Sequence, residues 1–212
     1  MIEIRRGFRS EIEGFVSEKK DITIGTMFSG TGKCSYSCYC ACSDNKLPDK
    51  RYKIFQSQRQ TPNNEVIQMD AAEGVIYILK LWELPVNIRN IFFTIDIEDN
   101  NDKSIVYKNT YCTFTLGQEG RKVLHHELKG DDFQNECIIL LGILSRDRKS
   151  LRLSIPSSRY RNVFINMLPC FTKKEANNLM QNLGFRNNVI NELPVWIRES
   201  EQDSYLGIPM PV

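Results

Sequence analysis

The sequence has little of what usually marks an enzyme, a membrane protein or a nucleic-acid-binding protein. It contains only two histidines, and its formal net charge is +2. Such a small charge gives no electrostatic reason to expect binding to nucleic acid or to a membrane surface. The longest uncharged apolar run, residues 137–144, is far shorter than the roughly 20 residues of a membrane-spanning helix. We therefore predict no transmembrane segment and no nucleic-acid binding.

The start of the chain does not have the pattern of a signal peptide. Residues 1–7 include an acidic residue and no apolar stretch. The chain has seven cysteines, an odd number. Without a secretion signal, we expect these cysteines to remain free thiols in a reducing compartment. The sequence therefore predicts a cytoplasmic protein without disulfide bonds.

What the sequence does have is a series of segments with the period-two alternation of β-strands. The central stretch, residues 75–115, contains three such runs. In the second run, one set of alternate positions holds Ile91, Phe93, Ile95 and Ile97, and the other holds Phe92, Thr94, Asp96 and Glu98. Alternate side chains of a strand point to opposite faces of its sheet. We therefore expect a sheet with one apolar face, which the rest of the chain covers.

The other segments of the first three quarters of the chain fit the same pattern. Residues 136–146 are apolar at nearly every position, which is typical of a strand in the middle of a sheet. About ten strands are expected, with turns every ten or so residues, and this spacing is typical of a β-sandwich. The predicted fold class is all-β, with a two-sheet β-sandwich over residues 1–158.

After Pro156 the pattern changes to that of helices. Thr172 and Glu175 have the spacing of a capping box. Apolar residues then follow at helical spacing, and Gly184 fits a helix end. We predict a short α-helical C-terminal extension over residues 159–212, with a second short helix ending before Pro194. The apolar tail, residues 205–212, could dock on the sandwich, on a partner or nowhere, and docking on its own domain is the commoner outcome for such a tail.

Residues 34–42 contain cysteines at positions 34, 38, 40 and 42, which raises the possibility of a zinc site. Alternate residues of a strand are about 6.6 Å apart along one face. Zinc needs all its sulfur ligands about 2.3 Å from one point, so a straight strand does not bring them together. We favour the interpretation that these cysteines, with Tyr36, line a core face of a strand.

The residues available for catalysis are few. His125 and His126 are adjacent on a predicted strand and would face opposite ways. One of them could act as a base for Cys112 or Cys137, but both cysteines lie at core-facing positions, where a thiol is usually inert. We expect no enzyme activity, and a cysteine-dependent enzyme is kept as an alternative. A turn at residues 146–149 and Arg152 supply basic side chains, interpreted as solvated charges rather than as an anion-binding patch.

The order of several motifs resembles the TerD family of tellurium-resistance and stress-response domains. The matching segments are Arg6 and Gly7 with Ser10 and Ile12, residues 22–25, residues 54–63, residues 84–99, and Glu136 with residues 142–146. The resemblance covers about residues 3–156 and implies a β-sandwich, with calcium sites in loops at one end in typical members.

The positions that match the family's calcium loops have lost most of their acidic residues. The family's D-L-D-A-S loop corresponds here to residues 33–37, which begin with a lysine and contain no carboxylate. Calcium takes six to eight oxygen ligands, several of them charged. The residual candidates are Asp99, Asp102 and Asp70, with Asp96, Glu98 and Glu73 nearby in the sequence. We expect no cofactor, or a weakly bound calcium ion.

These observations lead to a hypothesis of function. We expect a non-catalytic, TerD-like binding or scaffold module of a bacterial stress-response or defence system of the tellurite-resistance type. It would act through protein–protein contacts, possibly made by the C-terminal extension, with residues 164–196 as the expected interface. The alternative is a calcium-responsive TerD domain that uses Asp99 and the acidic residues around it.

Overall fold

The computed structural model of this chain describes residues 1–30, 33–97, 110–129, 132, 138–147 and 150–156. These residues form twelve strands and one short 3-10 helix, η1 (Lys50–Tyr52). The strands are β1 (Ile2–Glu3), β2 (Arg9–Glu11), β3 (Ile22–Ser29), β4 (Cys34–Ala41), β5 (Lys53–Ile54), β6 (Val66–Ala71), β7 (Gly74–Leu79), β8 (Asn90–Ile97), β9 (Tyr111–Gln118), β10 (Arg121–Lys129), β11 (Ile138–Arg146) and β12 (Leu151–Ser154). The expected C-terminal extension and its boundary at residues 158 and 159 lie outside the described residues.

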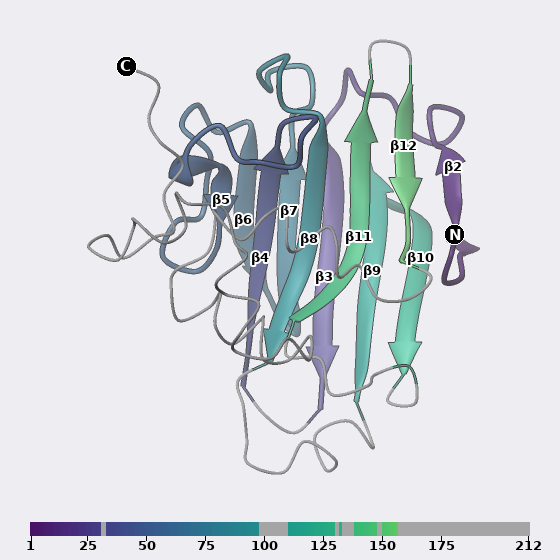
Figure 1. The fold of residues 1–212 in the computed structure, drawn as a ribbon. Coiled ribbons are helices and arrows are strands. Elements are labelled where there is room, and N and C mark those ends of the chain that lie inside the picture. Colours follow the sequence, from purple (N-terminus) through teal and green to yellow (C-terminus); the bar gives the residue numbers. More distant parts are fainter. Residues whose placement is uncertain (31–32, 98–109, 130–131, 133–137, 148–149, 157–212) are drawn as a thin grey trace, which may run out of the picture.

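The strands form two six-stranded sheets that pack face to face (Figure 1). Sheet A has the strand order β1-β10-β9-β3-β7-β6, and sheet B has the order β2-β12-β11-β8-β4-β5. All neighbouring strands are antiparallel except β1 and β10, which are parallel. The prediction of an all-β sandwich is confirmed. No helix among the described residues has the length and apolar character needed to cross a membrane.

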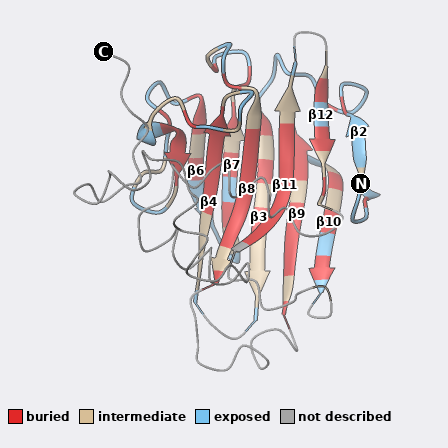
Figure 2. Cartoon of the chain, viewed as in Figure 1, coloured by how far each residue is buried: buried red, intermediate tan, exposed pale blue. Residues whose placement is uncertain are grey.

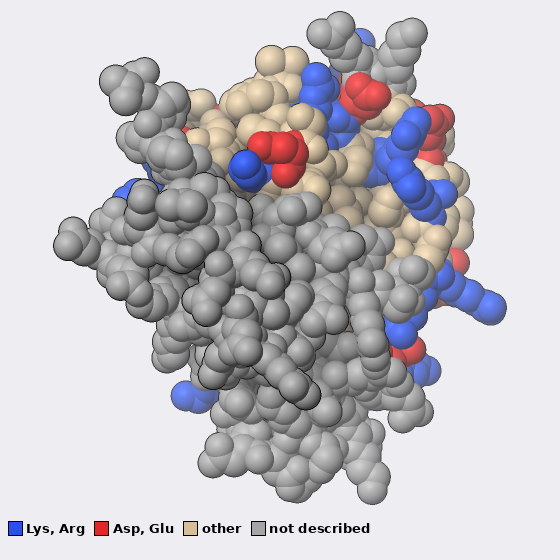
Figure 3. Space-filling view, in the orientation of Figure 1, with Lys and Arg blue, Asp and Glu red and all other residues tan. Residues whose placement is uncertain are grey.

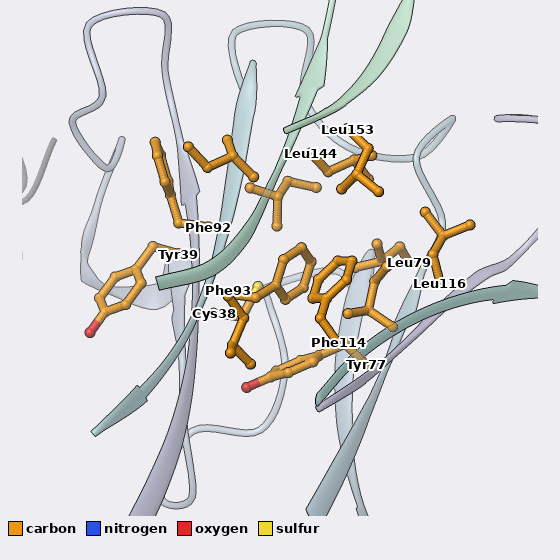
Figure 4. Packing of buried hydrophobic residues seen from close by; sticks show 14 of the residues in the cluster. Cys38, Tyr39, Tyr77, Leu79, Phe92, Phe93, Phe114, Leu116, Leu144 and Leu153 are labelled. Carbon is orange, nitrogen blue, oxygen red and sulfur yellow. The ribbon is translucent and has the colours of Figure 1, made fainter. Parts of the chain in front are cut away.

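The core between the sheets is built around three aromatic side chains (Figure 4). The ring of Phe93 on β8 lies 5.4 Å from that of Tyr77 on β7 and 5.6 Å from that of Phe114 on β9. All three residues are fully buried. The tilted and edge-on arrangements are those that aromatic rings prefer, because the positive edge of one ring meets the negative face of another. These contacts join strands of sheet B to strands of sheet A.

The alternation expected in the central stretch is confirmed, but two conclusions drawn from it were wrong. The three runs do not form one sheet, since β8 belongs to sheet B while β7 and β9 belong to sheet A. Sheet B also has no open polar face along β8. Phe92 and Thr94, which point away from the core, are 2% and 1% exposed. Figure 2 shows β8 and β11 buried along most of their length.

A half-buried guanidinium group connects the end of β11 to the loop between β7 and β8. Arg146 is half-buried and donates hydrogen bonds to backbone carbonyl oxygens of Leu81, Leu84, Pro85 and Ile88. The planar group presents five N–H donors, which suits it to several carbonyls at once. The interpretation of Arg146 as a solvated charge in a turn was therefore wrong.

We predict that Arg146→Met destabilises the chain by about 2–3 kcal/mol, because it leaves buried carbonyls without donors. The matched control is Arg152→Met, which removes an exposed cross-strand ion pair with Glu11 at 3.2 Å and is expected to cost less than about 1 kcal/mol. Urea unfolding of both variants measures the difference. Equal losses in the two variants would contradict the role assigned to Arg146.

Candidate functional site

One end of the sandwich collects the loops in which the sequence placed the metal candidates. Strand β3 ends at Ser29 opposite Tyr111, and β4 begins at Cys34 opposite Ile97. The β6–β7 turn, residues 72–73, lies at the same end, because β7 runs antiparallel to β3. The ends of β3 and β8, and the starts of β4 and β9, therefore lie at the same end of the sandwich, toward the lower edge of Figure 1.

Of the three predicted calcium ligands, the structure describes only Asp70. It is exposed on β6, and its Oδ2 atom lies 2.7 Å from Nη1 of Arg59. Asp99 and Asp102 lie outside the described residues. In the part of the chain that the structure describes, no three His, Cys, Asp or Glu side chains form a group that could hold a metal ion. The predicted calcium set is thus neither confirmed nor contradicted, and Asp70 already has a cationic partner.

The cysteines of β4 line the core, as the sequence predicted. Cys38 and Cys40 are fully buried, and Cys34 is partly buried at the start of the strand. Cys42 differs from the prediction because it lies beyond the end of β4, half-buried, where its Sγ accepts a hydrogen bond from Asn87 at 3.7 Å. Burial raises the pKa of the Cys38 thiol and also that of the Cys112 thiol on β9. A raised pKa keeps a thiol neutral at physiological pH, and the neutral form is a poor nucleophile.

The two histidines face opposite sides of sheet A, as expected from their adjacency. His125 is half-buried on the outer face, and its Nδ1 lies 2.8 Å from Oγ1 of Thr115. His126 is 3% exposed on the inner face, where its Nδ1 donates to the carbonyl oxygen of Ile4 at 2.9 Å. Nε2 of His126 is buried without a hydrogen-bond partner. His126 therefore joins β10 to the segment after β1, a structural role.

The outer face of sheet A carries an apolar patch that the sequence analysis did not single out. Met69 on β6 lies opposite Ile76 on β7, and Ile67 lies opposite Ile78. Met69 and Ile76 are 50% and 38% exposed. On its other side Ile76 faces Gly25 of β3, which has no side chain to cover it. We call Ile67, Met69, Ile76 and Ile78 the sheet A patch. Its signal in the sequence was the run of apolar residues on both faces of β7.

A search with family models returned no match to the chain, and a search of curated proteins also returned none. Similar solved structures were found. One is a homologue of the telluride resistance protein TerD from Streptomyces coelicolor A3(2), with a TM-score of 0.47, 11% identity, and coverage of 70% of this chain and 95% of that chain. Another is the protein of unknown function SAV2460, with a TM-score of 0.44, 8% identity, and coverage of 69% and 95%.

The Streptomyces coelicolor structure is described as a homologue of TerD. TerD also gives its name to the family that the sequence motifs resemble. At these identities and TM-scores the likeness is a similarity to known folds, and no shared activity or ligand follows from it.

We predict that the stability of the chain falls as pH drops below about 6.5, the ordinary pKa of histidine. Burial lowers the pKa of His126 in the folded state. The unfolded chain then binds the proton more readily, so stability is full above the unfolded pKa and is lost as pH falls towards the folded pKa. His126→Asn keeps a donor for Ile4 and should flatten this dependence. Urea unfolding between pH 7.5 and 5 measures it.

The control for this prediction is His125→Asn, which should retain the pH dependence of the original chain. A slope that persists in His126→Asn and disappears in His125→Asn would contradict the assignment.

Proposed function

We propose that this chain is a non-catalytic, TerD-like binding module that works through protein–protein contacts in a bacterial stress-response or defence system, in the cytoplasm. The observation that carries this proposal is the sheet A patch. Large apolar side chains packed side by side on an exposed face gain free energy when a partner removes them from water, by about 25 cal/mol for each Å² of apolar area.

The face of β6, rather than its edge, is the part available to a partner. β6 is the last strand of sheet A. Its backbone is already engaged near its start, because the Gln68 amide donates to the carbonyl oxygen of Arg59 at 2.6 Å, and the Thr61 amide donates to that of Val66 at 3.0 Å. An added strand would have to displace these bonds. A partner that lays a complementary apolar surface on the patch displaces only water.

The polar surroundings of the patch also suit a protein contact. The ion pair of Arg59 and Asp70 lies next to Met69, with side-chain exposures of 41% and 70%. Interfaces between proteins commonly have an apolar centre and a polar, solvent-accessible rim. Burial raises the pKa of the Cys38 and Cys112 thiols, and the two histidines contact Thr115 and the carbonyl oxygen of Ile4. A neutral, buried thiol is a poor nucleophile, which supports the non-catalytic part of the proposal.

We predict that Ile76→Lys reduces the recovery of protein partners at least 10-fold in affinity capture of the full chain from its native cells, quantified by mass spectrometry. A lysine at the centre of an apolar contact would have to be desolvated. The matched control is Glu127→Lys, an exposed position on the same face of sheet A but on β10, which should leave recovery unchanged. Unchanged recovery in Ile76→Lys, with an unchanged melting temperature, would count against the proposal.

A calcium-responsive domain is the second candidate, favoured by the position of Asp70 at the end of the sandwich where residues 98–109 connect β8 to β9. Because Arg59 pairs with Asp70 and residues 33–37 supply no carboxylate, we predict at most weak binding, with a dissociation constant of about 1 mM or more. Calorimetric titration of the full chain with calcium chloride measures this.

The same titration of two variants shows which residues bind the calcium ion. Asp99→Ala should abolish any weak binding, and Arg59→Gln should strengthen it if Asp70 is a ligand. A micromolar site that disappears in Asp99→Ala would favour the calcium-responsive function over the one proposed.

A further inference from the structure

A groove of about 390 Å³ lies on the outer face of sheet B, across β2, β12, β11 and β8. Its floor follows one line of paired residues, since Ser154 lies opposite both Arg9 and Ile143, and Ile143 lies opposite Phe92. Residues that are directly opposite each other point to the same face of a sheet. Small-molecule sites have volumes of about 300–1,000 Å³, so the groove is large enough to hold a small ligand.

The middle of the groove is apolar and is built on paired backbone. Phe92 and Ile143 lie side by side on β8 and β11, and Phe8 and Ile155 line the groove from the residues next to β2 and β12. The Ile155 amide donates to the carbonyl oxygen of Phe8 at 2.8 Å, and the Gly7 amide donates to that of Ile155 at 3.1 Å. A surface fixed in this way loses little conformational freedom when a ligand binds.

One end of the groove has a positive charge without a partner. Arg9 is exposed on β2, and its side chain makes no ion pair or hydrogen bond with any residue that the structure describes. Arg152, which lies two residues before Ser154 on β12, instead pairs with Glu11 at 3.2 Å. A guanidinium group binds a carboxylate through two parallel hydrogen bonds. The Arg9 end of the groove is therefore suited to a carboxylate.

The other end of the groove presents two side-chain amides. Nδ2 of Asn90, at the start of β8, donates to Oδ1 of Asn45 at 2.8 Å. This bond leaves Oδ1 of Asn90 as an acceptor and Nδ2 of Asn45 as a donor. Ser145, which lies opposite Asn90 on β11, adds a hydroxyl group. A ligand group that both donates and accepts hydrogen bonds, such as an amide, is complementary to this end.

The two polar ends lie three strands apart, which is about 14 Å across the sheet. The long side chain of Arg9 covers part of this distance, and the remaining space suits a molecule of the size of one capped amino acid. In Figure 3, which has the orientation of Figure 1, basic and acidic side chains lie around an uncharged, tan area of the described surface on the side of β11 and β12. An apolar body between two polar groups matches this arrangement.

We propose that this groove binds a small organic acid. Arg9 holds its carboxylate, Phe92 and Ile143 contact its apolar body, and the side chains of Asn45 and Asn90 bind an amide group at its other end. The proposal does not depend on the proposed protein contact, which uses the other sheet.

Titration of the full chain with N-acetyl-L-phenylalanine, followed by two-dimensional NMR, tests the proposal. This compound has a carboxylate, an apolar ring and an amide, and its matched control, N-acetyl-L-phenylalaninamide, lacks the negative charge. We expect the acid to shift the backbone signals of Phe8, Ser154 and Ile155 and to leave those of Met69 and Ile76 unchanged. The acid should bind at least about 10-fold more tightly than the neutral compound, because hydrogen bonds between charged groups are stronger than neutral ones.

Three variants assign this preference to its residues. Arg9→Gln should weaken binding of the acid at least about 10-fold and leave binding of the neutral compound unchanged. Arg152→Gln, the matched control, removes a guanidinium group that is already paired and should leave the binding of both compounds unchanged. Asn90→Ala should weaken both compounds by a similar factor, because each of them carries the amide group.

Three results would overturn the proposal. The first is equal affinity of the original chain for the acid and the neutral compound. The second is the absence of shifts at Phe8, Ser154 and Ile155 up to about 10 mM of the acid, a concentration that reveals even weak binding. The third is a preference for the acid that persists undiminished in Arg9→Gln, which would place the carboxylate elsewhere.

Discussion

The contact on which this structure depends is the meeting of Phe93 with Tyr77 and Phe114 between the two sheets. It joins β8 of sheet B to β7 and β9 of sheet A, and all three rings are fully buried. Burial of one such side chain contributes about 1.5–3 kcal/mol to the stability of the folded chain, and each aromatic pair adds about 0.5–1.5 kcal/mol to it. Because this layer is filled by side chains, the described residues can carry function only at the ends of the sandwich and on its two outer faces.

The outer face of sheet A is the surface on which the proposed protein contact depends. It presents Met69 and Ile76 to solvent, with exposed fractions of 50% and 38%. A solvent-facing apolar patch is suited to a partner that binds and dissociates. The end of the sandwich adds a second region, in which Arg59 forms an ion pair with Asp70.

Much of the fold could be predicted because side chains alternate between the two faces of a strand, so the sequence pattern indicates which of them point into the core. The alternation of residues 91–97 identified the inward set on β8, and the apolar run of residues 136–146 placed β11 in the middle of a sheet, between β8 and β12. The same alternation does not say whether the outward face is covered. Thr94 and Asp96 looked like solvent-facing residues, yet Thr94 is buried and Asp96 is half-buried. Sheet membership was also missed, since consecutive strands can alternate between sheets without changing their local pattern.

The site was harder to predict than the fold. Arg146 meets carbonyls from residues 81–88, and no local pattern indicates such a distant partner. The sheet A patch depends on the register of β6 and β7, which sets Met69 opposite Ile76. This register is known only once the two strands are seen paired in the structure. Asp70 lies within β6 rather than in the connection that follows it, and its pairing with Arg59 was not predicted.

The central claim is that Phe93, Tyr77 and Phe114 fill the space between the two sheets. It is tested most directly by solution NMR of the full chain with a soluble nitroxide, which broadens the signals of side chains that it can approach. The account predicts that the ring signals of Phe93 and Phe114 are protected, while the ring of Phe15, which is 45% exposed, is strongly broadened. Broadening of Phe93 and Phe114 to the level of Phe15 would contradict it.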